Sequence, residues 1–291
     1  MEEYDPDVVV SVHPTMNFVP SRVNKRIARS RNKYIPFFTV VTDFGSAHCT
    51  WFQGNVDKMY VASERIRRLA RRRSTITEEK LIMSGLPIRH DFSVQAQKMG
   101  DRNSEAGKEY RKAIKKNLDI NPEKRMILVM GGGEGVGSLS CIAEELYINL
   151  KKQGIDATIC VVCGRNEKLR EELNSKNWDE VSLEPKPKKT KKGIMRILEK
   201  KRKVVDESPS EEIQCSRKGD VDVVGLGFIN RMAEYMVAAD VLVSKAGPGS
   251  IAEAAAVGLP VMLTRWVKIH FDVTVILMVE LIILSYQTLS C

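Results

Sequence analysis

The segment from Val223 to Thr264 constrains the fold of this 291-residue chain more than any other part of it. The apolar run Val241 to Val243 predicts a buried parallel strand, Gly247-Pro248-Gly249 predicts a tight turn, and Ser250 to Val257 predicts an Ala-rich helix. A strand, a glycine loop and a helix in this order direct unpaired backbone N–H groups and the positive end of the helix dipole at one point. The segment therefore predicts an anion site, with phosphate as the expected anion.

Two polar residues near the start of this helix have open roles. Ser250 can cap the helix or contact a phosphate oxygen. Glu253 follows three residues later, which is the spacing of a capping box, so it can close the cap or turn outward and accept hydrogen bonds from ribose hydroxyls. The spacing alone does not decide between these roles.

A second strand, glycine run and helix occur earlier in the chain. Met126 to Met130 predicts a buried strand, the run Gly131 to Gly137 follows it, and Leu139 to Leu150 predicts the next helix. This is the context that a phosphate-binding loop requires. The alternative is that the glycines allow the helix to pack closely on the sheet.

Short apolar or β-branched runs alternate with helical segments along the chain, which predicts an α/β fold with parallel sheets. With 43% hydrophobic and 29% charged residues, 291 residues suffice for two such domains. We expect a first domain at residues 1–118, a second at 119–264 and a divergent apolar tail at 265–291. Strands of the first domain are expected at Val8–Val12, Phe37–Thr42, Lys58–Val61 and Leu81–Met83, separated by helical or loop segments such as Arg22–Arg31 and Ser63–Arg73.

The net charge of +9 comes from one segment, because residues 185–203 hold ten Lys or Arg and a single Glu, while the rest of the chain is balanced. This segment lies in an expected basic insertion at 184–219. It has no aromatic residues for stacking and no recognised nucleic-acid motif, so nucleic acid is not an expected partner. Apolar residues close to one helical face suit an anionic lipid surface, and a solvated, disordered insertion is the alternative.

The cysteines do not predict a metal site. Cys160 and Cys163 form a CxxC, but they lie at an apolar run that predicts buried strand thiols, and no second CxxC accompanies them. We therefore expect reduced thiols, no metal and no cofactor. The six cysteines are Cys49, Cys141, Cys160, Cys163, Cys215 and Cys291.

Four segments resemble one enzyme family in their order and rough spacing. They are DVVVSVHPTMNFVP from Asp7, VVTDFGSAHCTWF from Val40, GLPIRHDF from Gly85, and a block from Gly227 that ends in KAGPGSIAEA and GLP. Together they resemble the monogalactosyldiacylglycerol synthases, which are GT-B glycosyltransferases of the family 28 type, over about residues 5–264. The resemblance implies two Rossmann-like domains that face each other across a cleft.

The resemblance also implies an activity. It is a UDP-sugar-dependent hexosyltransferase that moves galactose from UDP-galactose to 1,2-diacylglycerol in galactolipid biosynthesis. It further implies a peripheral protein of the plastid (chloroplast) envelope membrane. The alternatives are another GT-B transferase that moves a hexose or N-acetylglucosamine to a lipid acceptor, and a non-catalytic module that binds nucleotide or lipid.

Several site residues follow from the same resemblance. Arg89 is expected at the donor's phosphates, where a guanidinium stays charged and binds two oxygens at once. Trp51 and Phe52 resemble the family's exposed aromatic pair near the acceptor and anionic lipid, although without the resemblance such residues are more often in the core. Asp43 and His48 are the catalytic candidates in this chain, although we favour a turn-capping role for Asp43 and a hydrogen-bonded loop role for His48. The other donor-binding residues are expected at Phe228, Ile229, Gly133, Glu134, Gly135, Gly249, Ser250, Ile251, Ala252 and Glu253.

Both ends of the chain depart from the family pattern. The family's catalytic base is a histidine in a glycine-rich loop upstream of the VHP segment, and that loop would precede Met1. After Thr264 the family continues into a PGQE-type loop, whereas this chain continues RWVKIHFDV. We therefore expect a chain truncated at both ends, with two incomplete domains and little or no transferase activity by itself.

Overall fold

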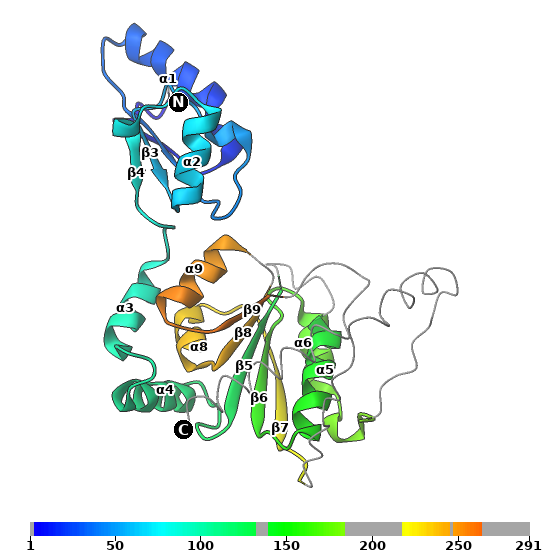
Figure 1. Cartoon of the computed structure of the whole chain (residues 1–291). Helices are drawn as coiled ribbons and strands as arrows, with labels where there is room; N and C mark the ends of the chain where they lie inside the picture. Colours follow the sequence, from blue (N-terminus) through cyan, green and yellow to red (C-terminus); the bar gives the residue numbers. More distant parts are fainter. Residues whose placement is uncertain (1–2, 132–138, 184–216, 245–246, 264–291) are drawn as a thin grey trace, which may run out of the picture. The chain divides into compact units, whose positions relative to one another are not determined.

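The computed structural model describes residues 3–131, 139–183, 217–244 and 247–263. The chain forms two compact units. The first unit comprises residues 1–107 and 246–259, and the second comprises residues 108–245 and 260–291. Each unit contains one parallel sheet, whose strands are labelled in Figure 1.

The sheet of the first unit has the strand order β1-β2-β3-β4, and all its strands are parallel. Neighbours in space are also neighbours in sequence, so each connection is a short crossover. The strands are β1 (Val9–Ser11), β2 (Phe37–Val40), β3 (Lys58–Val61) and β4 (Leu81–Met83). The helices of the unit are α1 (Phe18–Ser30), α2 (Glu64–Arg73), α3 (His90–Met99) and α9 (Pro248–Ala256), with 3-10 turns η1 (Pro14–Met16), η2 (Cys49–Trp51) and η3 (Glu78–Lys80).

The core of this unit forms where α2 packs on β3 and β4. Met59 and Val61 alternate along β3 with less buried residues, so one face of the strand lies against the core. Ile66 and Ala70 are four residues apart on α2 and fully buried, which places both on the helical face that meets the sheet. The Ser63 hydroxyl accepts a hydrogen bond from the Ile66 N–H at 3.4 Å and caps the start of α2.

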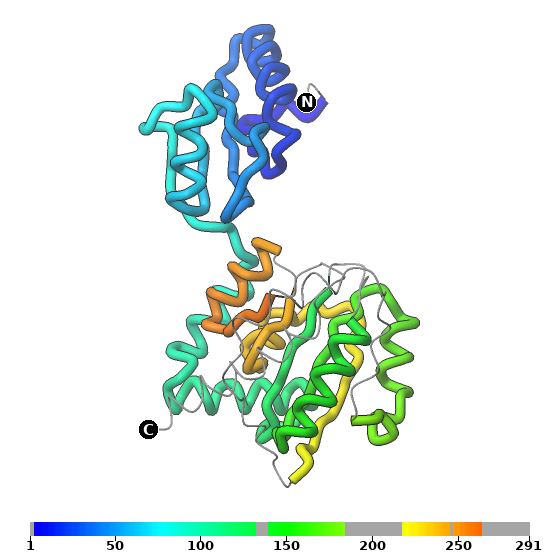
Figure 2. The backbone as a smooth tube through the Cα atoms, turned by 45° about the vertical axis from the view of Figure 1, so that its right-hand side comes forward, coloured from blue at the N-terminus to red at the C-terminus, as the bar shows by residue number. Residues whose placement is uncertain are grey.

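The sheet of the second unit has the strand order β7-β6-β5-β8-β9, again all parallel. Figure 1 shows α5 and α6 on one face of this sheet and α8 on the other, and the tube in Figure 2 shows the same arrangement. The strands are β5 (Arg125–Met130), β6 (Ala157–Val162), β7 (Val221–Leu226), β8 (Val241–Ser244) and β9 (Val261–Leu263). The remaining elements are α4 (Glu105–Asn117), which crosses the boundary between the units, α5 (Leu139–Lys152), α6 (Glu167–Ser175), η4 (Trp178–Glu180) and α8 (Met232–Ala238).

Helices on both faces explain why β5 is apolar without alternation. Met126, Ile127, Leu128 and Val129 are all buried, because side chains on either side of the strand meet a helix layer. Burial of such aliphatic side chains contributes about 1.5–3 kcal/mol each. The central strands therefore anchor the second unit.

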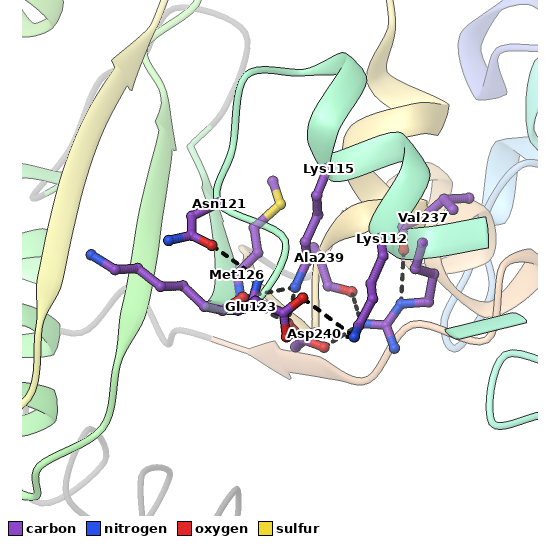
Figure 3. Close-up of polar contacts among 10 residues, drawn as sticks. Lys112, Lys115, Asn121, Glu123, Met126, Val237, Ala239 and Asp240 are labelled. Atoms are coloured by element: carbon purple, nitrogen blue, oxygen red, sulfur yellow. Dashed lines mark hydrogen bonds and ion pairs between the residues drawn. The ribbon is translucent and has the colours of Figure 1, made fainter. Parts of the chain in front are cut away.

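A largely buried ionic cluster, formed by Asp240, Arg111, Lys115 and the Met126 amide, joins α4 to the amino ends of β5 and β8 (Figure 3). The Lys115 ammonium lies 3.1 Å from the Asp240 carboxylate, which accepts a hydrogen bond from the Met126 N–H at 2.7 Å and also pairs with Arg111. Burial by itself would raise the pKa of Asp240, but Lys115, Arg111 and the amide together hold that pKa below its ordinary value.

Arg111 and Lys115 also bind carbonyl groups of neighbouring segments. Arg111 donates to the Val237 and Ala239 carbonyls at 3.2 and 3.3 Å, and Lys115 donates to the Lys124 carbonyl at 2.9 Å. The cluster thus ties α4 to the chain before β5 and to the connection between α8 and β8.

The predicted α/β architecture with two parallel sheets is confirmed, and β3 and β4 have the predicted bounds. Helix α1 begins at Phe18, before the expected Arg22. Helix α9 begins at Pro248, two residues before the expected Ser250, because proline is well suited to the first helical turn. The compact units also differ from the expected division at residue 118, since α9 packs against α3 and groups with the first unit.

Three predicted features lie outside the described residues. They are the glycine-run residues Gly133, Glu134 and Gly135, the basic segment 185–203 and the apolar tail 265–291. Among the residues that the structure does describe, we find no helix with the length and apolar character needed to cross a membrane.

Candidate functional site

In the sheet of the second unit, the order in which the chain adds strands reverses between β5 and β8. From β5 the chain adds β6 and then β7 on one side, and it returns to add β8 and β9 on the other side. In open parallel sheets, ligands bind outside the carboxyl ends of the strands at such a switch point. The two predicted glycine loops follow β5 and β8 in sequence.

Residues at the carboxyl ends of β5 and β7 have different surroundings. A Cβ placed on Gly131, directly after β5, would lie 2.9 Å from a methyl carbon of Leu139, so this first glycine allows close packing at the start of α5. Phe228 follows β7 with 70% of its surface exposed, and Ile229 is half-buried. An aromatic side chain so exposed at a strand end is available to a ligand.

Helix α9 follows the second glycine turn, where the sequence predicts an anion site. Gly247 is its N-cap residue, Pro248 occupies the first turn, and within the described residues no side chain caps this end of the helix. The amides of Gly249 and Ser250 therefore lie in the turn whose N–H groups have no carbonyl partner within the helix. Together with the helix dipole, such a terminus favours a bound anion.

Arg89 and Glu253 form a two-bond ion pair within the first unit. The Arg89 Nε donates to Glu253 Oε1 at 2.7 Å, and its Nη2 donates to Oε2 at 2.9 Å. The hydrogen bond to Glu253 raises the pKa of Arg89 above its ordinary value, so the guanidinium stays charged. Its Cζ also lies 4.9 Å from the centre of the Phe92 ring, in a cation–π contact.

The other end of α9 is held by a second arginine. Arg102 is buried and donates from Nη1 to the Val257 carbonyl at 3.2 Å, where the negative end of the helix dipole favours a cation. Gly258 follows with φ of +63°, and the Gly258 and Leu259 N–H groups bond to the Ala255 and Ala254 carbonyls at 3.0 and 2.9 Å. A glycine in this left-handed conformation ends the helix.

Of the roles left open for Ser250 and Glu253, the capping box is not formed. Ser250 lies inside the helix rather than at its N-cap, and the Glu253 carboxylate bonds to Arg89 instead of returning to the helix start. The reason is Pro248, which moves the start of the helix two residues earlier and leaves Glu253 in the second turn. Arg89 and Glu253, predicted separately as donor residues, are thereby brought together.

The expected exposure of Trp51 and Phe52 is also wrong. Both lie in the core of the first unit, 1% and 4% exposed, because these large rings fill the space beside β2 and β3. The Trp51 Nε1 donates to the Asp43 carboxylate at 2.7 Å. His48 precedes η2, and its Nδ1 lies 2.8 Å from the Thr50 hydroxyl. His48 is thus hydrogen-bonded within its loop, and the partner of Asp43 is the Trp51 indole rather than a turn amide.

The CxxC thiols are buried, as predicted. Cys160 and Cys163 are both 0% exposed, and burial raises the pKa of Cys160 to about 12. No group of three or more metal-ligating side chains occurs in the part of the chain that the structure describes.

Sequence reasoning missed two features of the first unit. Arg102 gave no signal, since its burial depends on α9, which follows more than 140 residues later. The second is a basic and apolar surface on α1 and the residues before it, which the whole-chain charge balance concealed. A local count would have found it, because residues 8–42 contain six Lys or Arg and no Asp or Glu.

Two protein-family models match parts of the chain. Residues 1–88 match the monogalactosyldiacylglycerol (MGDG) synthase family, and residues 180–266 match the glycosyltransferase family 28 C-terminal domain. Over 268 residues, or 91% of its length, the chain is 30% identical to the probable monogalactosyldiacylglycerol synthase 2, chloroplastic, of Oryza sativa subsp. indica. It is likewise 30% identical to the monogalactosyldiacylglycerol synthase 1, chloroplastic, of Arabidopsis thaliana. The chain spans 45% and 40% of the lengths of these two relatives.

Solved structures are similar at lower identity. MurG of Acinetobacter baumannii is 14% identical with a TM-score of 0.43, over 94% of this chain and 56% of that chain. The glycosyltransferase WaaG, involved in lipopolysaccharide biosynthesis, is 12% identical with a TM-score of 0.42, over 81% of this chain and 61% of that chain. Because both scores lie below 0.5, the relationship rests on the sequence relatives.

Proposed function

Because this chain belongs to the monogalactosyldiacylglycerol synthase family of glycosyltransferases, we propose that it transfers galactose from UDP-galactose to 1,2-diacylglycerol. The observation that carries the proposal concerns the start of α9. A glycine turn leads to a helix start without a side-chain cap, and Glu253 of the same helix binds the guanidinium of Arg89. That combination suits the diphosphate of a nucleotide sugar.

In the proposed reaction, the diacylglycerol hydroxyl gives its proton to a general base and attacks galactose C1 from the face opposite UDP. The C1–O bond to UDP breaks with inversion, and UDP leaves with the electron pair of that bond. Negative charge therefore grows on the diphosphate in the transition state. Fixed N–H donors and a guanidinium directed at that charge stabilise the departing group.

We assign the donor contacts as follows. The amides of Gly249 and Ser250, with the Ser250 hydroxyl, bind the diphosphate together with Arg89. Ile251 and Ala252 follow them at the start of the helix, where the Ile251 N–H donates to the Gly247 carbonyl at 3.1 Å. Phe228 and Ile229 contact the donor, as do Gly133, Glu134 and Gly135, which lie outside the described residues. Glu253 also belongs to this site. We give Asp43 and His48 no part in proton transfer, because both are engaged within their own loop.

The test is a transfer assay with the purified chain. Radiolabelled UDP-galactose, UDP-glucose and UDP-N-acetylglucosamine are each offered with diacylglycerol in mixed micelles, and lipid products are separated by thin-layer chromatography. Because little or no transferase activity is expected of this chain by itself, we expect at most a trace of monogalactosyldiacylglycerol, from UDP-galactose alone, together with binding of UDP in a calorimetric titration. A labelled lipid from one of the other two donors would instead identify a different transferase, and the absence of both product and UDP binding would contradict the proposal.

We further propose that the chain works at an anionic lipid surface of the plastid envelope. Its named relatives are chloroplastic enzymes, and diacylglycerol is a membrane lipid. In the first unit, the start of α1 and the residues before it expose large apolar side chains beside cationic ones. Arg22, for example, lies 4.2 Å above the ring of Phe18, which is 46% exposed. The exposed apolar residues are Val8, Val10, Val12, Met16, Phe18, Val19 and Val23, and the cations of α1 are Arg22, Lys25, Arg26 and Arg29.

Exposed apolar side chains among lysines and arginines suit the interface of a negatively charged bilayer. Flotation with vesicles of phosphatidylglycerol and phosphatidylcholine tests this surface. Replacing Phe18 and Val19 by serine should reduce binding several-fold, whereas the same change at Phe44 and Met83, which are comparably exposed elsewhere in the unit, should not. Equal binding of both double variants would contradict the assignment of this surface.

A further inference from the structure

We propose that Arg165 is a further donor-binding residue, whose guanidinium stacks on the uracil ring of UDP-galactose. This inference rests on the proposed function, and it names the part of the donor that the ends of β6 and β7 recognise. The supporting observation is an exposed arginine three residues beyond the end of β6, one strand away from the exposed ring of Phe228.

Arg165 and Phe228 lie at the same edge of the second unit's sheet. Strands β6 and β7 are parallel neighbours, and Val162, the last residue of β6, pairs with Leu226, the last residue of β7. The Cys163 N–H donates to the Leu226 carbonyl at 2.8 Å, so both strands end at the same level. Neighbouring strands are about 4.8 Å apart, so the two following loops begin close together. A single planar ligand at this edge can therefore contact both side chains.

The backbone around Arg165 is held by its neighbours. Gly164 has a φ of +62°, a left-handed conformation that turns the chain after β6 and favours glycine. The Asn166 side chain accepts a hydrogen bond from the Leu169 N–H at 3.1 Å and caps α6. Two residues with structural roles thus fix the position from which the exposed Arg165 side chain extends.

The Arg165 guanidinium is available to a ligand. Two other arginines that follow β6 and β7 have carboxylate partners, since Arg170 donates to Glu167 at 3.0 Å and Arg231 pairs with Glu234. Among the residues that the structure describes, no group forms a hydrogen bond or an ion pair with the guanidinium of Arg165. Its five N–H donors and both of its planar faces are therefore free for a bound molecule.

The distance along the sheet edge fits a nucleotide. Ligands of open parallel sheets bind at the switch point, which here lies between β5 and β8. From β5, the end of β6 is one strand spacing away and the end of β7 is two spacings away, or about 10 Å. This span is comparable with the separation of diphosphate and base in an extended nucleotide. A donor whose diphosphate lies at the switch point therefore places its base beside Arg165 and Phe228.

The two side chains suit a base better than a phosphate. A guanidinium is planar and stacks on flat rings, and bases bound by proteins commonly lie on aromatic rings or on guanidinium planes. The Phe228 ring, 70% exposed, offers a base a second surface but offers a phosphate no hydrogen bond. We therefore assign Arg165 to the uracil and not to the diphosphate.

The test is a set of dissociation constants measured by calorimetry with the full chain. The ligands are UDP and 5,6-dihydro-UDP, whose puckered base keeps the uracil oxygens but stacks poorly. We expect Arg165→Ala to weaken UDP by about 5- to 30-fold, the lower part of the range for one stacking contact, and to weaken dihydro-UDP much less. Arg165→Lys should lose as much UDP affinity as Arg165→Ala, because an ammonium keeps the charge but has no planar surface.

Arg217→Ala is the matched control. Arg217 is another exposed arginine of the second unit, with 69% of its side chain accessible, but it precedes β7 at the opposite, amino edge of the sheet. The substitution removes the same charge and should change neither constant. Thermal unfolding midpoints of all variants separate weakened binding from weakened folding.

Three outcomes would overturn the assignment. Equal losses for UDP and dihydro-UDP would show that Arg165 acts through its charge or its hydrogen bonds rather than by stacking. Full UDP affinity of Arg165→Lys would identify a phosphate contact, and unchanged affinity of Arg165→Ala would show that Arg165 does not contact the donor. In each of these cases the wild-type chain still binds UDP, so only the role of Arg165 is wrong. If the wild-type chain binds no UDP, the proposed function fails and this inference fails with it.

Discussion

Replacing Asp240 by asparagine leaves the Lys115 ammonium and the Arg111 guanidinium facing a neutral amide (Figure 3). The side chains of all three residues are 15% exposed or less, so water replaces little of the lost interaction. Removing one partner of a buried ion pair typically destabilises a protein by 3–5 kcal/mol. Asparagine keeps an acceptor for the Met126 N–H, so we expect the lower end of that range, about 3 kcal/mol.

Urea unfolding at pH 7, followed by circular dichroism, measures this change. With a slope of about 2 kcal/mol per molar, a loss of about 3 kcal/mol moves the midpoint by about 1.5 M. Asp222→Asn is the matched control, since Asp222 pairs with Lys124 but its side chain is 52% exposed. A pair that exposed contributes about 0–1 kcal/mol. Equal midpoints for the two variants would refute the reasoning.

The same comparison has a defined pH dependence. The folded-state pKa of Asp240 is lowered, so its contribution to stability is present above the pKa of the unfolded chain, about 3.9, and is lost as pH falls through the folded-state value. The difference between wild type and Asp240→Asn should therefore be largest near neutral pH and shrink below about pH 4. A difference that grows on acidification would contradict the sign.

Three further predictions concern other parts of the fold. Trp51→Phe removes the indole N–H that binds Asp43, so the unfolding free energy should fall by about 1–3 kcal/mol in urea unfolding, and an unchanged value would indicate that this bond adds nothing. Iodoacetamide at pH 8 should alkylate the exposed Cys141 and leave Cys160 unmodified in the folded chain, because burial raises the Cys160 pKa to about 12. Mass spectrometry of tryptic peptides measures both modifications, and rapid modification of Cys160 would disprove its burial. Gly258→Ala should lower the thermal midpoint, since a side chain at φ of +63° costs about 1–2 kcal/mol, and a raised midpoint would be the contrary result.

The strands could be predicted well because their signal is local. In β5 and β8 a continuous apolar run reports burial on both faces, and that burial follows from the parallel sheet itself. Helix starts were less predictable. At α9 the serine and glutamate spacing suggested a cap, but a proline two residues earlier already satisfied the first turn.

In the candidate site, too, local features could be predicted from the sequence and long-range contacts could not. The glycine turn before α9 could be found from the sequence, because backbone geometry restricts which residues form it, whereas the glycine run after β5 lies outside the described residues. The Arg89–Glu253 pair could not be found, since its two members are 164 residues apart and each was assigned to a different part of the donor. Trp51 and Phe52 show the limit of resemblance, because a motif identifies residues but not whether their rings face solvent or core.

The grouping of α9 with the first unit has a consequence for how the chain folds during its synthesis. Residues 246–259 are synthesised after nearly all of the second unit, yet they belong with residues 1–107. While the ribosome is still adding the second sheet, the first unit lacks one of its helices and leaves the partner surface on α3 uncovered. Its completion requires contacts across more than 150 residues of chain, which slows folding and lengthens the period in which chaperones act.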